Sequence, residues 1–199
     1  MSYATRYFEE MRSILDQLDP ADLDRMAEKL ALVRERGGRL FFIGCGGGAG
    51  HASHAVNDFR KIAGIESYCP TDNVSELTAR INDDGWESCY ANWLKGCRLT
   101  ARDALFIFSV GGGNAEKNIS PNIVQALKMA KSVGADVFGV VGRDGGYTKE
   151  VATCAIVVPT VSPDTITPHT ESFQAVLWHL LVSHPKMKTA EMKWESTEA

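Results

Sequence analysis

LFFIGCGGGAGHASHAVNDFRK, residues 40–61, is the stretch of sequence that decides the fold. It begins with a short apolar run, passes through a glycine-rich bend and continues with a helical pattern that carries His54 and Asp58. This order predicts a β-strand, a tight turn and an α-helix. Glycine lets the backbone come close to a ligand, and the first turn of a helix offers free N–H groups that suit a phosphate. The stretch therefore predicts an anion-binding turn with an imidazole and a carboxylate close by.

Strand-like and helix-like segments alternate along the rest of the chain. Further strands are predicted at 65–69, 104–110, 137–141 and 155–158, and helices at 5–18, 20–36, 74–81, 86–96, from 121 onward and at 168–183. Asp19, Ser120 and Thr167 are the expected N-caps of three of these helices. The alternation is typical of an α/β sandwich with a mainly parallel sheet. Glycine-rich loops at 44–48, 111–113 and 142–146 follow three of the strands, and ligands bind beyond the carboxyl ends of such strands.

Composition limits the class of protein. A chain of 199 residues suits one well-packed domain, and 44% hydrophobic residues support an ordinary core. The net charge of −4 argues against a nucleic-acid binder. No run of 18 apolar residues and no N-terminal secretory segment is found, so neither a membrane span nor a membrane partner is expected. Five cysteines without a CxxC pair are typical of a reduced, cytoplasmic protein.

Four ionisable residues are candidates for chemistry. His54 and Asp58 are four residues apart, so they project from one face of an exposed helix and could share a metal ion, form an acid–base pair, or only hydrogen-bond. His51 lies one turn earlier and is expected to support them rather than bind the ion. Glu171 and His179 are eight residues apart, about 12 Å along a helix, which is far for two ligands of one ion unless the first turn is irregular. The alternative without a metal ion is that Glu171 is a first-turn carboxylate that interacts favourably with the helix dipole, and that His179 packs in the core.

Several motifs follow one another in an order that carries a resemblance. They are GCGGG at 44–48, His54, ELTA at 76–79, NDDGW at 82–86, SVGG at 109–112, SPN at 120–122, GRDGG at 142–146, and the pair Glu171 and His179. In this order they resemble the sugar isomerase (SIS) superfamily and, within it, the phosphoheptose isomerase group. The resemblance covers nearly the whole chain.

The resemblance implies a three-layer α/β sandwich with a five-stranded, mainly parallel, flavodoxin-like sheet and two N-terminal helices. It implies one SIS domain over residues 1–199, with an oligomerisation segment at 1–37, a core at 38–185 and a tail at 186–199. It also implies a homotetramer with active sites at subunit junctions. The implied function is an aldose–ketose isomerase that converts sedoheptulose 7-phosphate to a heptose 7-phosphate through an enediol. The alternative is a non-catalytic SIS module that binds a sugar phosphate or a protein partner, as in the type that associates with the replication initiator.

The resemblance also assigns roles to residues. One Zn²⁺ ion per subunit would be held by His54, Asp58, Glu171 and His179, with Asp58 as the base and His179 as the acid or proton relay. The substrate would contact Cys45, Gly46, Gly47, Asn82, Asp83, Ser109, Gly111, Gly112, Ser120 and Glu171.

The chain departs from the family pattern at its phosphate loops and at two of these ligands. Asp58 stands where the family has glutamate, and Glu171 where it has glutamine. Gly48, Val110 and Gly111 replace residues with hydroxyl groups, and an insertion at 113–119 separates the glycines from the following serine. We therefore expect the phosphate contacts to pass to backbone N–H groups of residues 111–114, with Lys117 adding a positive charge.

Overall fold

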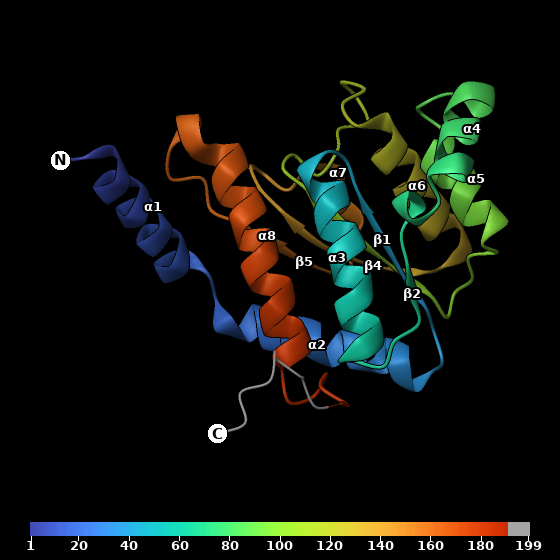
Figure 1. Ribbon diagram of the computed structural model, residues 1–199, viewed down its shortest axis with the longest axis horizontal. Helices are drawn as coiled ribbons and strands as arrows, with labels where there is room; N and C mark the ends of the chain where they lie inside the picture. The colour runs from blue at the N-terminus through green and yellow to red at the C-terminus, as the bar shows by residue number, and fades with distance from the viewer. Residues whose placement is uncertain (191–199) are drawn as a thin grey trace.

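The computed structural model describes residues 1–190, so most of the tail predicted at 186–199 lies outside the described residues. Figure 1 shows the elements in chain order. The helices are α1 (Tyr3–Gln17), α2 (Pro20–Glu35), α3 (Gly47–Lys61), α4 (Val74–Asp84), α5 (Cys89–Gly96), α6 (Pro121–Val133), α7 (Gly146–Val151) and α8 (Ile166–Ser183). The strands are β1 (Leu40–Gly44), β2 (Ser67–Tyr68), β3 (Ala104–Ser109), β4 (Asp136–Val141) and β5 (Cys154–Val157). Short 3₁₀ turns occur at Pro70–Asp72 and Pro163–Thr165.

The sheet has five parallel strands in the order β2-β1-β3-β4-β5, which confirms the predicted flavodoxin-like fold. β1 pairs with β2 on one side and with β3 on the other, from Leu40 opposite Ala104 to Gly44 opposite Phe108. The order of the strands reverses at β1, so the loops after β1 and β3 lie at the topological switch point. This is the place where open α/β sheets bind ligands.

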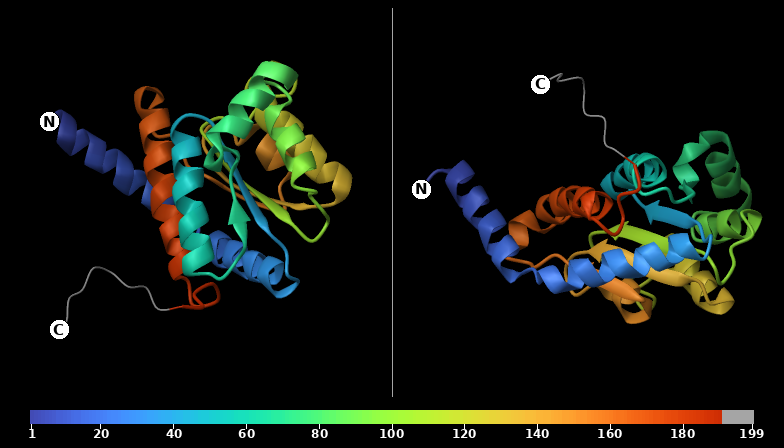
Figure 2. Two further views of the ribbon diagram at one scale, coloured as in Figure 1. Left: turned by 45° about the vertical axis from the view of Figure 1, so that its right-hand side comes forward. Right: turned by 90° about the horizontal axis from the view of Figure 1, so that it is seen from below.

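Helices cover both faces of the sheet and create two hydrophobic cores (Figures 1 and 2). On one face α2, α3 and α8 pack against alternate strand residues such as Phe42, Phe106 and Phe108. On the other face α5 and α6 pack against Phe41 and Ile107, the neighbours in the same strands. Successive strand side chains point to opposite faces. The apolar runs of the sequence therefore reflect strands that are buried on both sides.

Helix boundaries agree with the sequence except at a few ends. Asp19 caps α2 as expected, because its Oδ1 accepts a hydrogen bond from the Ala21 N–H at 2.9 Å. Ser120 precedes α6 but does not cap it, since its left-handed backbone (φ 50°) directs no side-chain hydrogen bond to the helix. Thr167 is not a cap either, because α8 begins one residue earlier, at Ile166. α5 begins at Cys89 rather than 86, and the short helix α7 was not predicted because it starts within a glycine-rich motif.

Helix α1 extends away from the rest of the protein (Figures 1 and 2). Ile14 is its one buried residue. Glu10 attaches it to the start of α8, since Oε2 accepts hydrogen bonds from Thr165 Oγ1 at 2.7 Å and from His169 Nε2 at 2.8 Å. These bonds lower the pKa of the Glu10 carboxyl. The large apolar side chains that α1 leaves more than half exposed are Tyr3, Phe8 and Leu15.

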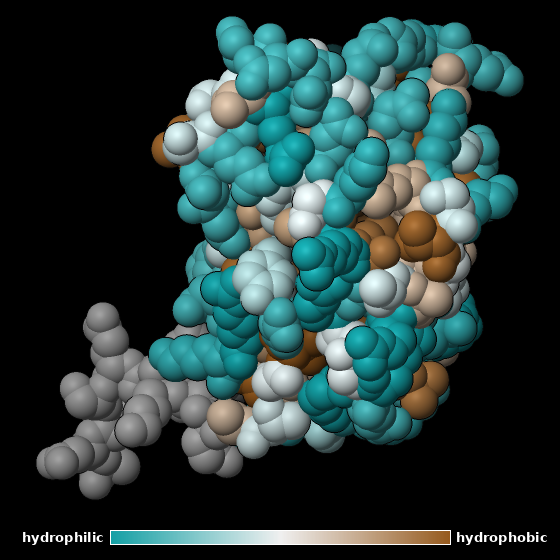
Figure 3. All heavy atoms as spheres, turned by 90° about the vertical axis from the view of Figure 1, so that its right-hand side faces the viewer, coloured by the Kyte–Doolittle hydropathy of each residue, from teal (hydrophilic) through white to brown (hydrophobic). Residues whose placement is uncertain are grey.

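The surface over α4, α5 and α6 is mainly hydrophilic, with a few hydrophobic side chains between the polar ones (Figure 3). Within residues 1–190, none of the helices combines the length and the apolar character that crossing a bilayer would need.

Candidate active site

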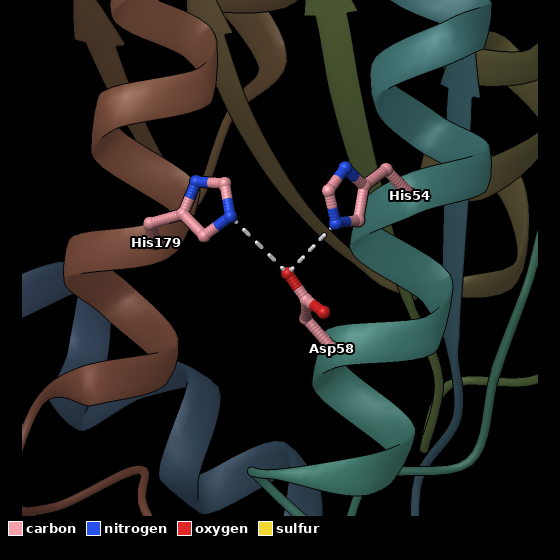
Figure 4. A group of neighbouring side chains, drawn as sticks. All are labelled: His54, Asp58 and His179. Atoms are coloured by element: carbon pink, nitrogen blue, oxygen red, sulfur yellow. Dashed lines mark ion pairs between the residues drawn. The ribbon is translucent and has the colours of Figure 1, made fainter. Parts of the chain in front are cut away.

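A carboxylate lies between two imidazoles where α3 and α8 pack side by side (Figure 4). His54 and Asp58 come from α3, and His179 reaches them from α8. The Nε2 atoms of both histidines lie 3.6 Å from Oδ2 of Asp58. This separation is longer than a hydrogen bond, for which N···O distances of about 2.7–3.2 Å are typical. The three side chains therefore face one point, at ion-pair distances (dashed lines in Figure 4) that are too long for hydrogen bonds.

Neighbouring groups fix the orientation of this cluster. Asp58 is buried, with 7% of its surface exposed, which corrects the expectation of an exposed helix carboxylate. Its Oδ2 accepts a hydrogen bond from Trp178 Nε1 at 3.1 Å, and its Oδ1 accepts one from Asn57 Nδ2 at 3.0 Å. Nδ1 of His179 lies 2.8 Å from the Ala175 carbonyl oxygen, which can only accept a hydrogen bond. In the neutral ring Nδ1 therefore carries the proton, and Nε2 presents a lone pair toward Asp58.

The geometry fits a divalent metal ion. The ligand atoms of His54, Asp58 and His179 all lie within 4.8 Å of one another. Two ligands at about 2.1 Å from a tetrahedral ion lie roughly 3.4 Å apart, close to the observed N···O separations. Two imidazole nitrogens and a carboxylate oxygen suit Zn²⁺ or a similar ion and leave a fourth position open. The backbone hydrogen bond of His179 is the kind of contact that orients a metal-binding histidine.

Glu171 lies apart from these three residues, in a cavity at the switch point. It is not part of the metal-ligand group that the described residues form, and the spacing of about 12 Å along α8 is the reason. The cavity has a volume of about 180 Å³. Its lining consists of Cys45, Gly48, Ser109, Val110, Gly111, Ser120, Glu171 and Gln174. The carboxylate lies directly over Gly47, where a Cβ atom would come within 2.5 Å of its Oε1. The absence of a side chain at position 47 therefore makes room for Glu171.

Two further glycines are required by close packing of the backbone. A Cβ atom on Gly48 would lie 2.4 Å from the carbonyl oxygen of Phe108, so the serine of the family pattern has no room here. A Cβ atom on Gly112 would lie 1.9 Å from the carbonyl oxygen of Gly145.

The expected group of anion-binding amides at 111–114 is smaller than the sequence indicated. The Gly112 N–H already donates to Ser109 Oγ at 3.1 Å. The Asn114 N–H donates to the Ile119 carbonyl oxygen at 2.9 Å. Since these two donors serve the loops themselves, the N–H groups of Gly111 and Gly113 are the ones left for an anion among the four expected.

Of the remaining residues predicted to contact the substrate, some lie at the cavity and others lie away from it. Gly46 occupies the N-cap position of α3 with a positive φ of 55°, which glycine adopts without strain. Cys45 lines the cavity and accepts a hydrogen bond from Asn122 Nδ2 at 3.4 Å. Asn82 and Asp83 are exposed in the last turn of α4, bonded to each other at 2.8 Å, and do not line this cavity.

Two residues that the sequence did not assign to the site, Gln174 and Trp178, hold α8 against α3. Besides the bond from Trp178, Oε1 of Gln174 accepts a hydrogen bond from Nδ1 of His51 at 2.9 Å, and Nε2 of Gln174 donates to the Val140 carbonyl oxygen at 3.0 Å. His51 thus contributes to the contact between the helices, and its expected role in supporting His54 and Asp58 stays a prediction. The four-residue spacing from Gln174 to Trp178 places both on one face of α8, but nothing in this spacing identifies α3 as the element they contact.

The fold and site define a class: a flavodoxin-like α/β protein with a ligand cavity at its switch point and a cluster beside it that can hold a divalent ion. The family model of the SIS domain matches residues 6–142, and the chain belongs to this family.

Relatives within the family are of several kinds. The chain is 33% identical over 174 residues to the lincomycin biosynthesis protein LmbN of Streptomyces lincolnensis, covering 84% of this chain but only 63% of that protein. It is 30% identical over 169 residues to a phosphoheptose isomerase of Solidesulfovibrio magneticus, covering 82% of this chain and 77% of the relative. Its structure is similar to that of the phosphoheptose isomerase GmhA from Neisseria gonorrhoeae, with a TM-score of 0.78 at 22% identity over 90% of this chain and 96% of that one.

Proposed function

We propose that the chain is an aldose–ketose isomerase of sugar phosphates, with sedoheptulose 7-phosphate as its substrate and a heptose 7-phosphate as its product. The observation that carries the proposal is the buried Asp58 carboxylate held between two histidines on α3 and α8. The relatives named phosphoheptose isomerase support the choice of substrate.

The proposed reaction moves one proton between neighbouring carbons. Asp58 takes the proton from the carbon next to the carbonyl and returns it to the former carbonyl carbon, passing through an enediol. We assign His179 as the acid or proton relay between the two oxygens, because its Nε2 presents a lone pair toward the same point as the carboxylate; this nitrogen can carry the proton only while it does not bind the metal ion. General acid–base catalysis of this kind contributes about 10²–10⁴-fold to a rate.

The site has the ligands for one metal ion per subunit, which we propose is Zn²⁺. His54, Asp58 and His179 would hold it. When bound, the ion would polarise the carbonyl group and stabilise negative charge on the oxygens of the substrate. Glu171 and the cavity around it would instead bind hydroxyl groups of the sugar, because the carboxylate is a hydrogen-bond acceptor directed into that space.

The shape of the site favours an elongated substrate. The cavity is lined by Gln174 and Glu171, whereas His179 lies five and eight residues further along the same helix. These separations correspond to roughly 7 and 12 Å of helix rise. An open-chain sugar phosphate can extend from the cavity to the histidines, which a compact ligand cannot do.

We further propose that the protein is a cytoplasmic homotetramer whose N-terminal segment, residues 1–37, mediates association. α1 extends from the domain with exposed apolar side chains, and on α8 the side chains of Val176 and Leu180 are 47% and 39% exposed. Exposed apolar surface of this kind is typical of an interface. In a tetramer, Asn82 and Asp83 of one copy would be available to the site of another.

The direct test is isomerisation in D₂O. Wild-type protein incubated with sedoheptulose 7-phosphate is expected to form a heptose 7-phosphate and to incorporate deuterium at the carbon that receives the proton, as observed by NMR. If neither conversion nor deuterium incorporation occurs with protein that contains its metal, the proposed reaction is wrong.

A non-catalytic SIS module is the second candidate. The observation that favours it is the absence of side-chain hydroxyls at positions 48, 110 and 111, together with the lack of room for one at position 48. Such a module would bind sedoheptulose 7-phosphate without deuterium incorporation, so the same experiment with a binding measurement separates the two functions.

A further inference from the structure

A second and larger cavity adjoins the first one at the switch point. Its volume is about 460 Å³, against about 180 Å³ for the cavity that contains Glu171. Val110, Gly111 and Ser120 line both cavities, so the two share a wall. The second cavity extends from this wall to the insertion at 113–119 and to the loop between β4 and α7.

Two positively charged side chains line the second cavity. They are Lys117, from the insertion, and Arg143, from the loop after β4. Neither side chain has an ion-pair or hydrogen-bond partner among residues 1–190. The one carboxylate in the lining, Asp144, accepts a hydrogen bond from the Gly146 N–H at 3.0 Å. The cavity therefore offers two cations against one carboxylate, and neither cation forms an ion pair with it.

The backbone around this cavity is held in unusual conformations. In the described part of the chain four non-glycine residues have positive φ, and three of them lie here: Asn118 (52°), Ser120 (50°) and Arg143 (54°). Such conformations disfavour residues with side chains and gather at functional sites. The insertion is also braced, because Asn114 and Ile119 exchange backbone hydrogen bonds of 2.9 and 3.1 Å. The loop that carries Lys117 thus has a defined place beside the cavity.

We propose that the second cavity binds the phosphate group of the substrate and that Lys117 and Arg143 are its ligands, an inference that rests on the proposed function. Charge decides between the two cavities. The charged side chain in the lining of the first cavity is the Glu171 carboxylate, which repels a phosphate dianion. In the second cavity Lys117 and Arg143 outweigh the single carboxylate of Asp144, so the lining attracts the dianion. The first cavity then receives the uncharged hydroxyl groups in the middle of the sugar.

This assignment explains how the chain could bind a phosphate without the hydroxyl-bearing residues of the family pattern. Backbone atoms fill the space that a side chain at position 48 or 112 would need. The N–H groups of residues 112 and 114 donate hydrogen bonds within the loops. Charge-assisted hydrogen bonds from lysine and arginine are stronger than those from neutral hydroxyls, and an arginine can bind two phosphate oxygens at once. The insertion that interrupts the motif supplies one of the two replacements.

The test measures binding of sedoheptulose 7-phosphate and of unphosphorylated sedoheptulose by calorimetry, together with KM. The variants are Lys117→Gln, Arg143→Gln and the double variant. Lys128→Gln on α6 is the matched control, because it removes the same charge from an exposed position that does not line the cavity. Each single change is expected to weaken binding of the phosphorylated sugar roughly tenfold, and the double change further, without an effect on the unphosphorylated sugar.

The outcomes separate the subsite from the proposed function. If wild type converts the phosphorylated sugar and the variants do so with unchanged KM and affinity, the subsite is wrong and the isomerase stands. If wild type does not convert the sugar but binds inorganic phosphate in a way that the double variant loses, the subsite stands and the proposed substrate is wrong. Equal binding of both sugars by wild type, with no measurable binding of inorganic phosphate, overturns the subsite.

Discussion

Replacing Asp58 by asparagine removes the proposed base with little change of shape. In the wild-type protein Oδ2 of Asp58 accepts the Trp178 N–H at 3.1 Å and faces two histidine Nε2 atoms at 3.6 Å. Asparagine offers one oxygen, which can keep the bond to Trp178, and an NH₂ group that cannot take up a proton. That NH₂ group also cannot accept the bond from Asn57 Nδ2, but Asn57 is exposed and can hydrogen-bond to water instead. Asp58→Asn should therefore separate chemistry from folding.

The magnitudes follow from these contacts. Loss of a general base lowers the rate by about 10²–10⁴-fold, equal to roughly 3–5 kcal/mol of activation free energy. The stability cost is smaller, because a hydrogen bond to a charged acceptor is exchanged for a neutral one, a difference of about 1 kcal/mol. For a chain of this length that corresponds to a change in Tm of about 2–4 °C. The burial of Asp58 is why this cost exceeds that of an exposed helix carboxylate.

The assay follows deuterium incorporation into sedoheptulose 7-phosphate by NMR, with thermal unfolding measured on the same samples. Asp16→Asn is the control, because Asp16 is an exposed carboxylate on α1, outside the site. We expect loss of exchange for Asp58→Asn, normal exchange for the control, and folded protein in both. Exchange at the wild-type rate in Asp58→Asn would refute the assignment of the base.

Three further changes test other parts of the structure. His54→Ala combined with His179→Ala should abolish bound metal in protein purified without chelator; equal metal content in wild type and variant would contradict the metal site. Gly48→Ser should not improve affinity for the phosphorylated sugar and should lower the free energy of unfolding in urea by about 1–3 kcal/mol, as overpacking does; a stable variant with tighter binding would show that the backbone contact is not limiting. Hydrogen bonds from Thr165 and His169 lower the pKa of the Glu10 carboxyl below the ordinary glutamate value of 4.5, so its contribution to stability is present above that pH and is lost as the pH falls through the lower folded-state pKa. The difference in Tm between wild type and Glu10→Gln should therefore shrink below pH 4.5, and a constant difference would argue against the attachment of α1 through His169.

The sheet and its site could be predicted because the signals are local. Strands buried on both faces need continuous apolar runs, such as ALFIFS at 104–109, and glycine-rich loops mark where these strands end. The i,i+4 spacing of His54 and Asp58 fixed their common face before any tertiary contact was known. The assignment of Glu171 to the metal ion, which the resemblance implied, was wrong: the structure separates Glu171 from His179, as the helix rise between them indicates.

The rest depends on contacts between distant residues. The bond from Trp178 to Asp58 joins positions 120 residues apart, so no local pattern predicts that Asp58 is buried. The close approach of Gly48 to the backbone of Phe108 comes from the packing of α3 on β3, which a glycine in a sequence does not disclose. Ser120 is a good capping residue by type, but the loop before it imposes a left-handed conformation.

The two ends of the proposed site are built from different kinds of structure. This difference explains why the phosphate loops, with an insertion and three lost hydroxyl residues, depart further from the family pattern than the acid–base end, where Asp58 stands in place of a glutamate. The proposed acid–base residues lie on α3 and α8, whose contact is fixed by buried side chains such as Trp178, so a change there would disturb the packing of both helices. The proposed phosphate ligands lie on loops after β3 and β4, where an insertion adds residues without moving a strand. Loops on a rigid scaffold tolerate such changes and are where binding residues vary. An isomerase can therefore keep its proton-transfer site while the residues that bind the phosphate change. Comparing Asp58→Asn with Arg143→Gln measures the two parts of the site separately. Asp58→Asn should lower kcat, and Arg143→Gln should raise KM.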